Sequence, residues 1–215
     1  MKVVVTGSSN GIGKAIALKF LEENHQVIGI DIDKQTIVND NYTHIQESIL
    51  SDKLPDISNV DILINNAGVQ NSEDDIDVNL KGTINITEKY GLQDNIKSIL
   101  FMASLSATTG AEFPRYVASK GGMVSYMKYV AGEVAKYKAT SNSISAGGVL
   151  TDLNKHIIDD DKLYEAVLNE TLLHKWASPE EIADLTYYLT IINKSITGQD
   201  IIIDNGESMK YNFIW

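Results

Sequence analysis

The sequence predicts an α/β protein built on a doubly wound, mostly parallel sheet of seven strands with helices on both faces. Three observations support this fold class. Short apolar runs alternate with helical patterns along nearly the whole chain, which is typical of parallel strands joined by crossover helices. The first of these units carries a glycine-rich turn between its strand and its helix. The chain has 215 residues without repeats, low-complexity tracts or linkers, which agrees with a single domain over 1–215.

The composition excludes several classes of function. Hydrophobic residues make up 43% of the chain and charged residues 22%, as in an ordinary globular protein. The net charge is −11 and there is no basic run, so we expect neither a nucleic-acid partner nor a membrane partner. There is no cysteine, and the four histidines lack metal-ligand spacing, so we expect no metal site. No stretch resembles a signal peptide or a membrane span, which predicts a cytoplasmic protein.

The N-terminal unit is the first candidate for nucleotide binding. A β-branched run at 2–6 predicts a buried strand, the sequence GSSNGIG at 7–13 a turn, and 14–23 a helix. Glycines in such a turn let the backbone approach a pyrophosphate at the N-terminus of the helix. The spacing T-G-x3-G-x-G differs from the G-x-G-x-x-G form, so this motif alone leaves nucleotide binding and a purely structural turn open.

The second strand, predicted at 26–30, ends at an acid that bears on the choice of dinucleotide. Asp31 follows Gly13 by 31 − 13 = 18 positions, close to the roughly 20 expected for the acid that bonds the adenosine ribose. A carboxylate there repels a 2′-phosphate, so we expect NAD rather than NADP. Lys14 and Lys34 are the nearest cations that could reverse this preference. The alternative is that Asp31 is a simple turn residue.

The third and fourth strands are predicted at 42–46 and 60–64, and the fourth ends in the sequence NNAG at 65–68. Residues at the carboxyl ends of strands line the crevice of an open α/β sheet. This segment is therefore a candidate lining of a cofactor cleft, with a structural turn as the alternative. A helix predicted at 74–90 carries Asn79.

The fifth strand, predicted at 98–102, delivers Ser104 to its C-terminal end, and a long helix follows at 113–138. Tyr116 and Lys120 stand four apart on this helix and therefore share one face. An ammonium beside a phenol lowers the pKa of the tyrosine, as acid/base chemistry at a hydroxyl or carbonyl oxygen requires. An isolated pair with this spacing is more often a surface tyrosine and a solvated lysine.

The remaining strands are predicted at 140–145 and 199–203, the latter followed by a turn at 204–206. The polar, amphipathic segment 153–176 predicts one or two mobile helices over the crevice, forming a substrate lid. Its acid run is interpreted as a solvated helix start rather than a metal site. The apolar tail at 213–215 predicts packing on its own subunit or on a neighbour.

A late helix start is marked by three residues in succession. Ser178 is a capping residue, Pro179 suits the first turn and Glu181 stands at the third position, which together form a capping box. We expect this helix to run to about residue 190.

Together these motifs resemble the short-chain dehydrogenase/reductase family over almost the whole chain. TGSSNGIG resembles the cofactor-binding turn of that family, and NNAG the motif of its fourth strand. DVNLKG, Ser104 and YVASK resemble the segments that carry its four catalytic residues, and HKWASPEEIA and ITGQDIIID its late helix and last strand. The resemblance implies a Rossmann fold, a nicotinamide cofactor, and hydride transfer to or from a carbonyl or secondary alcohol.

The resemblance also implies roles for individual residues. Tyr116 would be the acid/base at the substrate oxygen, while Lys120 would hold the nicotinamide ribose and lower the pKa of Tyr116. Ser104 would hydrogen-bond the substrate oxygen, and Asn79 would position a water that links Lys120 to solvent. The cofactor-binding residues implied are Gly7, Asn10, Gly11, Ile12, Gly13, Asp31, Ile32, Asn65, Ala67, Gly68, Tyr116, Lys120, Val149 and Thr151.

The chain departs from the family pattern in places. Ser104 precedes Tyr116 by twelve positions, one fewer than the family spacing, which makes Ser106 a competing but less favoured catalytic serine. Glycines at 147–148 replace the usual Pro-Gly after the sixth strand. The segments after the third and fourth strands are shortened, which leaves the pocket either open or completed by a neighbouring subunit.

Two functions therefore stay open. The first is an NAD-dependent oxidoreductase acting on a small ketone or secondary alcohol, which the complete set of four catalytic residues favours. The second is a non-catalytic dinucleotide-binding or regulatory protein, which the shortened loops favour. The wide apolar surface of the helix at 113–138 and the family resemblance predict a homodimer or homotetramer.

Overall fold

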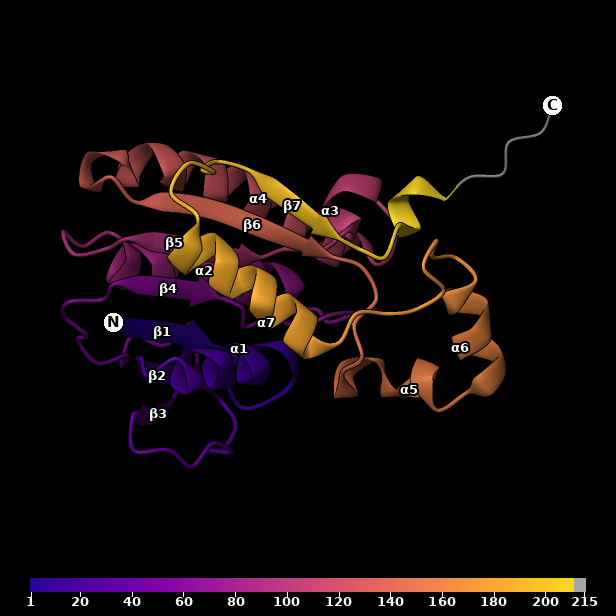
Figure 1. The fold of residues 1–215 in the computed structure, drawn as a ribbon, viewed down its shortest axis with the longest axis horizontal. Coiled ribbons are helices and arrows are strands. Elements are labelled where there is room, and N and C mark those ends of the chain that lie inside the picture. The colour runs from indigo at the N-terminus through magenta and orange to yellow at the C-terminus, as the bar shows by residue number, and fades with distance from the viewer. Residues whose placement is uncertain (211–215) are drawn as a thin grey trace.

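A computed structural model describes residues 1–210, which form a seven-stranded sheet between two layers of helices (Figure 1). The strand order is β3-β2-β1-β4-β5-β6-β7, and all six neighbouring pairs are parallel. The chain starts in the middle of the sheet, winds outward to β3, and then returns to build β4 to β7 on the other side. The doubly wound fold class predicted from the sequence is confirmed. The predicted packing of the tail at 213–215 lies outside the described residues.

The strands lie within two residues of their predicted positions, because each is a short apolar run bounded by polar or glycine-containing turns. Parallel strands are buried on both faces and therefore read as continuous apolar segments. Their bounds are β1 (Lys2–Thr6), β2 (Gln26–Asp31), β3 (Tyr42–Gln46), β4 (Ile62–Asn65), β5 (Ser98–Met102), β6 (Thr140–Ala146) and β7 (Asp200–Ile203).

The helices follow the predicted order, with two differences. The first begins three residues earlier than predicted, inside the glycine-rich turn, and the short α3 was not predicted because four Ser, Ala and Thr residues carry no helical periodicity. The bounds are α1 (Gly11–Glu22), α2 (Thr83–Ile86), α3 (Ser106–Thr109), α4 (Pro114–Val134), α5 (Lys155–Ile158), α6 (Asp161–Leu168) and α7 (Pro179–Tyr187).

Irregular helical turns extend several of these helices. Wider π-helical turns flank α2 on both sides, as η1 (Asp77–Gly82) and η2 (Thr87–Gly91), and a third, η5 (Tyr188–Ile192), continues α7. Single 3₁₀ turns are η3 (Ala135–Tyr137), η4 (Asp152–Asn154) and η6 (Glu207–Met209). The connection from β3 to β4 contains no helix, in agreement with the shortening seen in the sequence.

Two apolar layers hold the sheet between its helices. Helices α1 and α7 cover one face and α2 and α4 the other (Figure 1). Successive residues of β1 point to opposite faces, so Val3 and Val5 belong to the apolar layer that contains α1, whereas Val4 belongs to the layer on the other face. Helix α4 contributes a continuous buried face with residues spaced three or four apart: Met123, Met127, Val130 and Val134.

The predicted capping box at the start of α7 is confirmed. The Glu181 backbone N–H donates to Ser178 Oγ at 3.3 Å, and the Ser178 N–H donates to the Glu181 carboxylate at 2.9 Å. Two of the N–H groups that a helix start leaves unpaired are thereby satisfied. The start of α7 is therefore well defined, shortly after the segment 153–176.

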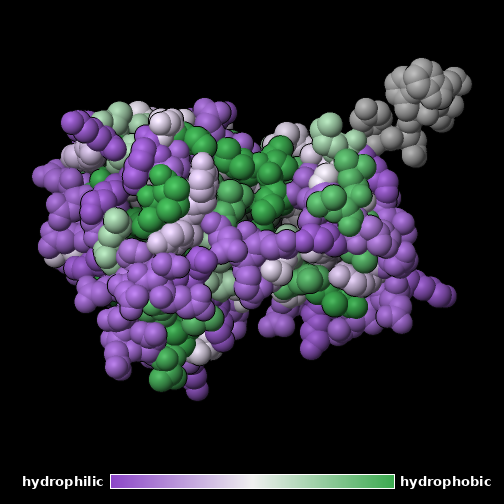
Figure 2. Space-filling model, in the orientation of Figure 1, coloured by the Kyte–Doolittle hydropathy of each residue, from purple (hydrophilic) through white to green (hydrophobic). Residues whose placement is uncertain are grey.

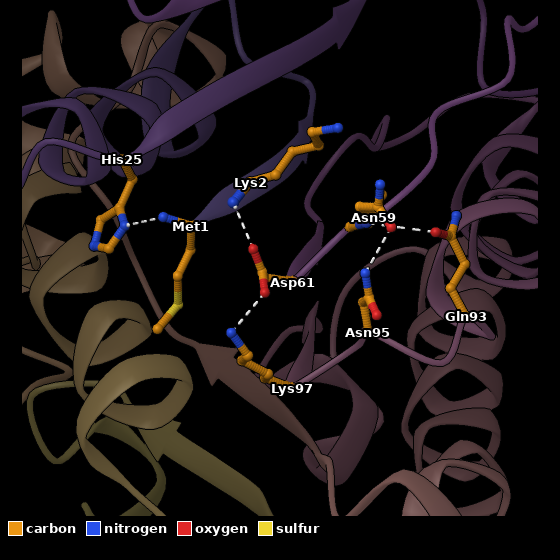
Figure 3. Close-up of polar contacts among 9 residues, drawn as sticks. Met1, Lys2, His25, Asn59, Asp61, Gln93, Asn95 and Lys97 are labelled. Atoms are coloured by element: carbon orange, nitrogen blue, oxygen red, sulfur yellow. Dashed lines mark hydrogen bonds and ion pairs between the residues drawn. The ribbon is translucent and has the colours of Figure 1, made fainter.

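Polar contacts tie together the amino ends of the central strands (Figure 3). Asp61 precedes β4 and accepts hydrogen bonds from the Lys2 backbone N–H at 2.8 Å and from the Lys97 ammonium at 2.7 Å. Nearby, the Asn95 amide donates to Asn59 Oδ1 at 2.7 Å. These contacts hold β1, β4 and β5 together at their amino ends. The residues predicted to be functional lie at the opposite side, near the carboxyl ends of the strands.

Candidate active site

The turn between β1 and α1 is shaped by glycines that leave no room for a side chain. Gly7 has a φ of 68°, in the left-handed region that favours glycine. A Cβ on Gly13 would lie 2.0 Å from the Gly7 carbonyl oxygen. Because these glycines carry no side chain, the backbone before α1 is uncovered, and we call the segment 7–13 the bare turn. The unpaired N–H groups of a helix N-terminus attract anions. This geometry fits a pyrophosphate.

Asn66 fastens this turn to β4, a role that the sequence did not reveal. Its amide donates to the carbonyls of Thr6 at 3.0 Å and Gly7 at 3.2 Å. In return, Thr6 Oγ1 accepts the backbone N–H groups of Asn66 and Ala67, both at 3.0 Å. The NNAG segment therefore forms one wall of the crevice, with Ala67 against the glycine-rich turn.

Asn65, which was predicted to line the cofactor cleft, directs its side chain away from the glycine-rich turn, so it could line the cleft only with its backbone. The side chain is buried under η2, where its amide donates to Thr87 Oγ1 at 2.9 Å. Neighbouring residues of a strand point to opposite faces, so Asn65 and Asn66 cannot both reach the same ligand. The sequence pattern NN did not indicate which of the two amides faces the turn.

Asp31 lies at the carboxyl end of β2, beside the glycine-rich turn. Its two carboxylate oxygens accept the backbone N–H groups of Ser9 at 2.8 Å and Asp33 at 2.9 Å. The Asn10 amide donates to the Asp33 carboxylate at 3.1 Å, and Ile32 is exposed between the two acids. Two negative charges therefore lie at the carboxyl end of β2, where an adenosine ribose would bind.

A cavity of about 510 Å³ opens between the start of α1 and the segment that follows β6. Gly11 and Thr151 line it together with residues of η4, α5 and α6. Ile12 and Val149, by contrast, pack their side chains into the apolar layer beneath α1, so only their backbone can face a ligand. The cavity and the bare turn fit a dinucleotide laid across the carboxyl ends of the strands.

Ser104, Tyr116 and Lys120 meet at the carboxyl end of β5. The Lys120 ammonium donates to the Met102 carbonyl at 2.8 Å and lies 5.6 Å from the centre of the Tyr116 ring. Ser104 accepts hydrogen bonds from the backbone and the hydroxyl of Ser106, at 3.2 and 3.0 Å. The Ser104 side chain works to lower the pKa of the Tyr116 phenol, which favours Ser104 over its competitor.

The predicted lowering of the Tyr116 pKa is wrong for this structure. Burial raises the pKa of Tyr116 to about 12, although the hydrogen bond with Ser104 works in the opposite direction. Burial also lowers the pKa of Lys120 to about 8. The Lys120 ammonium is held by the Met102 carbonyl and lies 5.6 Å from the centre of the phenol ring. Tyr116 is consequently a neutral proton donor at neutral pH.

Asn79 lies fully buried in η1 and connects this group to the fourth strand. Its side chain accepts the Val69 N–H and donates to the Val69 carbonyl, both at 2.8 Å, and also donates to Ser119 Oγ at 3.1 Å. A Cβ on Gly68 would lie 3.0 Å from Asn79 Oδ1 and 3.5 Å from the Lys120 ammonium. Because Gly68 has no side chain, the segment after β4 can approach both η1 and α4 at this point. π-Helical turns such as η1 are frequent at functional sites.

Two acids near Tyr116 were not singled out from the sequence. Asp75 is buried just before η1, and Glu112 precedes α4 with a φ of 81°, a left-handed conformation unusual for a side chain other than glycine. The Gln70 amide donates to the Glu112 carboxylate at 2.8 Å. No sequence pattern could have identified these acids, because they reach the site from two separate loops.

The departure at 147–148 has a structural explanation. A Cβ on Gly147 would lie 2.9 Å from a carboxylate oxygen of Glu207, and one on Gly148 would lie 2.2 Å from the Trp176 ring. Burial raises the pKa of the Glu207 carboxyl, and the backbone of Gly148 partly offsets that rise. Asp204 and Glu207 therefore occupy the space that a side chain at 147 would need, and Trp176 the space beside 148.

Helices α5 and α6 form a lobe beside the body of the protein (Figure 2). Neither helix buries a side chain. Leu153, which precedes α5, and Leu172 and Leu173, which follow α6, are also largely exposed. The two helices confirm the helical content predicted for 153–176. A segment with few buried contacts costs little to displace, so this lobe is the part of the site best suited to move.

Residues 1–210 contain no helix with the length and apolarity that a membrane crossing requires. Over the same residues, no cluster of three His, Asp or Glu side chains has the arrangement of a metal site. The doubly wound sheet, the bare glycine turn and the Ser–Tyr–Lys group define a dinucleotide-dependent oxidoreductase.

Comparisons with known proteins agree with this class. A family model described as enoyl-(acyl carrier protein) reductase matches residues 47–208. The 3-oxoacyl-[acyl-carrier-protein] reductase of Thermotoga maritima is 30% identical over 239 aligned positions, which cover 94% of this chain and 96% of the relative. Glucose 1-dehydrogenase of Gluconobacter oxydans is 27% identical, over 99% of this chain and 93% of the relative.

Among solved structures, a mutant of 4-hydroxyisoleucine dehydrogenase complexed with NADH and succinate superposes with a TM-score of 0.87. It is 26% identical and covers 99% of this chain and 100% of the other. The protein belongs to the short-chain dehydrogenase/reductase family. The alignment to the Thermotoga reductase has more positions than this chain has residues, so the chain lacks residues that this relative has.

Proposed function

We propose that the protein transfers a hydride between NAD(H) and a carbonyl or secondary alcohol carbon of a small-molecule substrate. The observation that carries this proposal is the meeting of Ser104, Tyr116 and Lys120 at the carboxyl end of β5, beside the crevice that the bare turn of β1 opens. No finding favours the non-catalytic alternative, since Ser104, Tyr116 and Lys120 lie together and Asn79 is buried in η1.

The nicotinamide supplies or accepts the hydride when it is bound. In the reductive direction Tyr116 donates its phenolic proton to the substrate oxygen, and in the oxidative direction it takes that proton back. Ser104 donates a hydrogen bond to the same oxygen and so fixes its position beside the phenol. The Lys120 ammonium beside the ring stabilises the phenolate that Tyr116 becomes after proton donation.

The residues proposed to hold the cofactor follow from the geometry of the crevice. The turn from Gly7 to Gly13 receives the pyrophosphate, Asp31 the adenosine ribose, and the 67–68 backbone the middle of the cleft. The segment with Thr151 flanks the nicotinamide, and helices α5 and α6 close as a mobile lid. A cytoplasmic location stays a prediction.

The test is oxidation of NADH by the purified protein against a panel of carbonyl compounds: keto forms of sugars and polyols, keto acids, 3-oxoacyl thioesters and ketosteroids. Turnover with one class supports the proposal and identifies the substrate. Tight NADH binding without turnover on the whole panel, together with normal cellular function of Tyr116→Phe, would instead support the non-catalytic alternative.

We expect NADH to be preferred over NADPH by at least about tenfold in kcat/KM. The 2′-phosphate would approach the carboxylates of Asp31 and Asp33, and repulsion between close like charges outside bulk water amounts to a few kcal/mol. In Asp31→Ala the preference for NADH should shrink, and most of the change should come from a lower kcat/KM for NADH. Steady-state kinetics with both cofactors measure this, and an equal preference in the wild type would contradict it.

We expect a homodimer or homotetramer with α4 at an interface. Tyr129 of α4 is 61% exposed and stacks on Tyr126 at a ring distance of 6.1 Å, which leaves a large aromatic surface uncovered in one subunit. Light scattering should give two or four times the 23.7 kDa of the chain. Tyr129→Lys should lower the mass, and a wild-type monomer at micromolar concentration would contradict the assignment.

A further inference from the structure

A chain of hydrogen bonds joins the bare turn to the loop that follows β2. Ser8 Oγ in the bare turn lies 2.9 Å from the Tyr42 hydroxyl, which in turn lies 3.2 Å from Nδ1 of His44. The other ring nitrogen of His44 lies 2.9 Å from the carbonyl oxygen of Asp33. Ser8 is fully buried and Tyr42 is 7% exposed, so the contact between them lies out of reach of bulk water. Three separate segments therefore meet in one chain of polar contacts: the bare turn, β3 and the loop after β2.

The chain depends on space that Gly29 leaves in β2. Tyr42 and His44 stand two apart on β3 and therefore share one face of this outer strand. Strand β2 separates β3 from β1 in the sheet, so the Tyr42 side chain must cross β2 to reach Ser8. A Cβ on Gly29 would lie 2.1 Å from the Tyr42 hydroxyl oxygen and 2.2 Å from Ser8 Oγ. A glycine weakens a strand, so its presence here serves the close approach of these two side chains.

The hydrogen-bonding capacity of each group fixes the direction of the chain. A backbone carbonyl only accepts, so Nε2 of His44 carries the proton that is donated to Asp33. In the neutral imidazole Nδ1 is then an acceptor, and the Tyr42 hydroxyl donates to it. The Tyr42 oxygen in turn accepts the proton of the Ser8 hydroxyl. Loss of either ring nitrogen or of the phenol oxygen therefore leaves a partner without its hydrogen bond.

The loop held in this way begins directly after Asp31, at the carboxyl end of β2. Its first five residues are exposed, so few packing contacts fix their position. Side chains of β3 instead bind two consecutive backbone carbonyls of the loop. The Gln46 amide donates to the carbonyl of Ile32 at 3.0 Å, and His44 donates to that of Asp33. The position of the Asp33 carboxylate relative to Asp31 therefore depends on β3.

We propose that Tyr42 and His44 are positioning residues of the cofactor site, which hold the loop after β2 against the bare turn. They keep Asp31 and Asp33 where the adenosine ribose would bind, and so set both the affinity for the adenosine half and the rejection of a 2′-phosphate. This role rests on the proposed function, because it requires a dinucleotide in the crevice. Three strands lie between β3 and β5, so both residues should change cofactor binding and not the chemical step.

The adenosine half can be tested alone with ADP-ribose, which lacks the nicotinamide. His44→Leu removes both hydrogen bonds of the ring, so calorimetry should show ADP-ribose binding about fivefold weaker, as expected for the loss of one or two hydrogen bonds. His44→Gln should restore binding to within about twofold of the wild type, because its amide can donate to the Asp33 carbonyl. Thr43→Val, at an exposed position on the opposite face of β3, should bind as the wild type does. Unchanged binding in His44→Leu overturns the inference, and so does equally weak binding by the Leu and Gln variants.

The ratio of the dissociation constants for NADPH and NADH gives a second measurement. A general loosening of the fold weakens both cofactors alike, whereas displacement of Asp33 should lower this ratio roughly threefold or more in His44→Leu. Tyr42→Phe removes the phenol oxygen and should lower the ratio as well, and it carries the prediction if His44→Leu does not fold. Fluorescence titration measures both constants, and an unchanged ratio in a folded variant contradicts the inference.

Turnover then separates positioning from catalysis. In Tyr42→Phe and His44→Leu the KM for NADH should rise, while kcat at saturating NADH stays within about twofold of the wild type. A fall in kcat with an unchanged KM overturns the positioning role. Wild-type protein that binds neither NADH nor ADP-ribose contradicts the proposed function, and this inference with it. If the wild type binds both and His44→Leu binds them equally tightly, only this inference is overturned and the proposed function still stands.

Discussion

Tyr116→Phe should lower kcat roughly a thousandfold or more while leaving NADH affinity within about twofold of the wild type. A positioned proton donor contributes about 10²–10⁴ in rate, and the phenylalanine ring has no proton to give. The ring itself stays, so the contact with the Lys120 ammonium and the packing of α4 are kept. Initial rates with the substrate found in the panel, and a fluorescence titration with NADH, measure the two quantities.

A second tyrosine provides the control for this substitution. Tyr137 lies in η3 at the far end of the same helical segment, where its ring packs beside the Lys136 ammonium. Tyr137→Phe removes the same oxygen atom from the same region and should retain wild-type kcat. Equal rates for Tyr116→Phe and the wild type would remove Tyr116 from the mechanism.

Gly13→Ala should reduce NADH affinity at least tenfold and destabilise the fold by roughly 1–3 kcal/mol, the usual cost of overpacking. The new methyl group would lie 2.0 Å from the Gly7 carbonyl oxygen and 2.4 Å from the Asn66 amide nitrogen. To relieve this contact, α1 must move away from the turn and open the pyrophosphate cradle. Urea unfolding and NADH titration report the two effects separately.

Gly132→Ala is the matched control for that substitution. Gly132 lies in α4, and a Cβ there would meet no atom within 4 Å apart from the backbone of its own helix. Because alanine favours a helix over glycine, this variant should be as stable as the wild type or more stable, by up to about 1 kcal/mol. Wild-type affinity in Gly13→Ala would show that the bare turn does not receive the cofactor.

The sequence could predict what depends on local pattern. Strands appeared as apolar runs, and the start of α7 followed from Ser178 and Glu181 because capping is decided within four residues. The face shared by Tyr116 and Lys120 followed from helical spacing alone. The succession of such motifs was specific enough to indicate the family, which a single motif would not have done.

Contacts between distant segments could not be predicted in this way. The inward turn of Asn65 toward Thr87 depends on which strand face lies under η2. The direction in which the Tyr116 pKa shifts depends on burial, which helical spacing alone does not reveal. The burial of Asp75 could not be predicted either, because its neighbours in the sequence are those of a polar loop.

The space beside Gly147 is filled by residues about sixty positions further along the chain, since 207 − 147 = 60. A side chain at 147 would meet the Asp204 backbone at 3.0 Å as well as the Glu207 carboxylate at 2.9 Å, so a shorter residue at 207 would clear only part of that space. Natural variants that carry a larger residue at 147 should therefore differ in the turn at 204–207 as a whole.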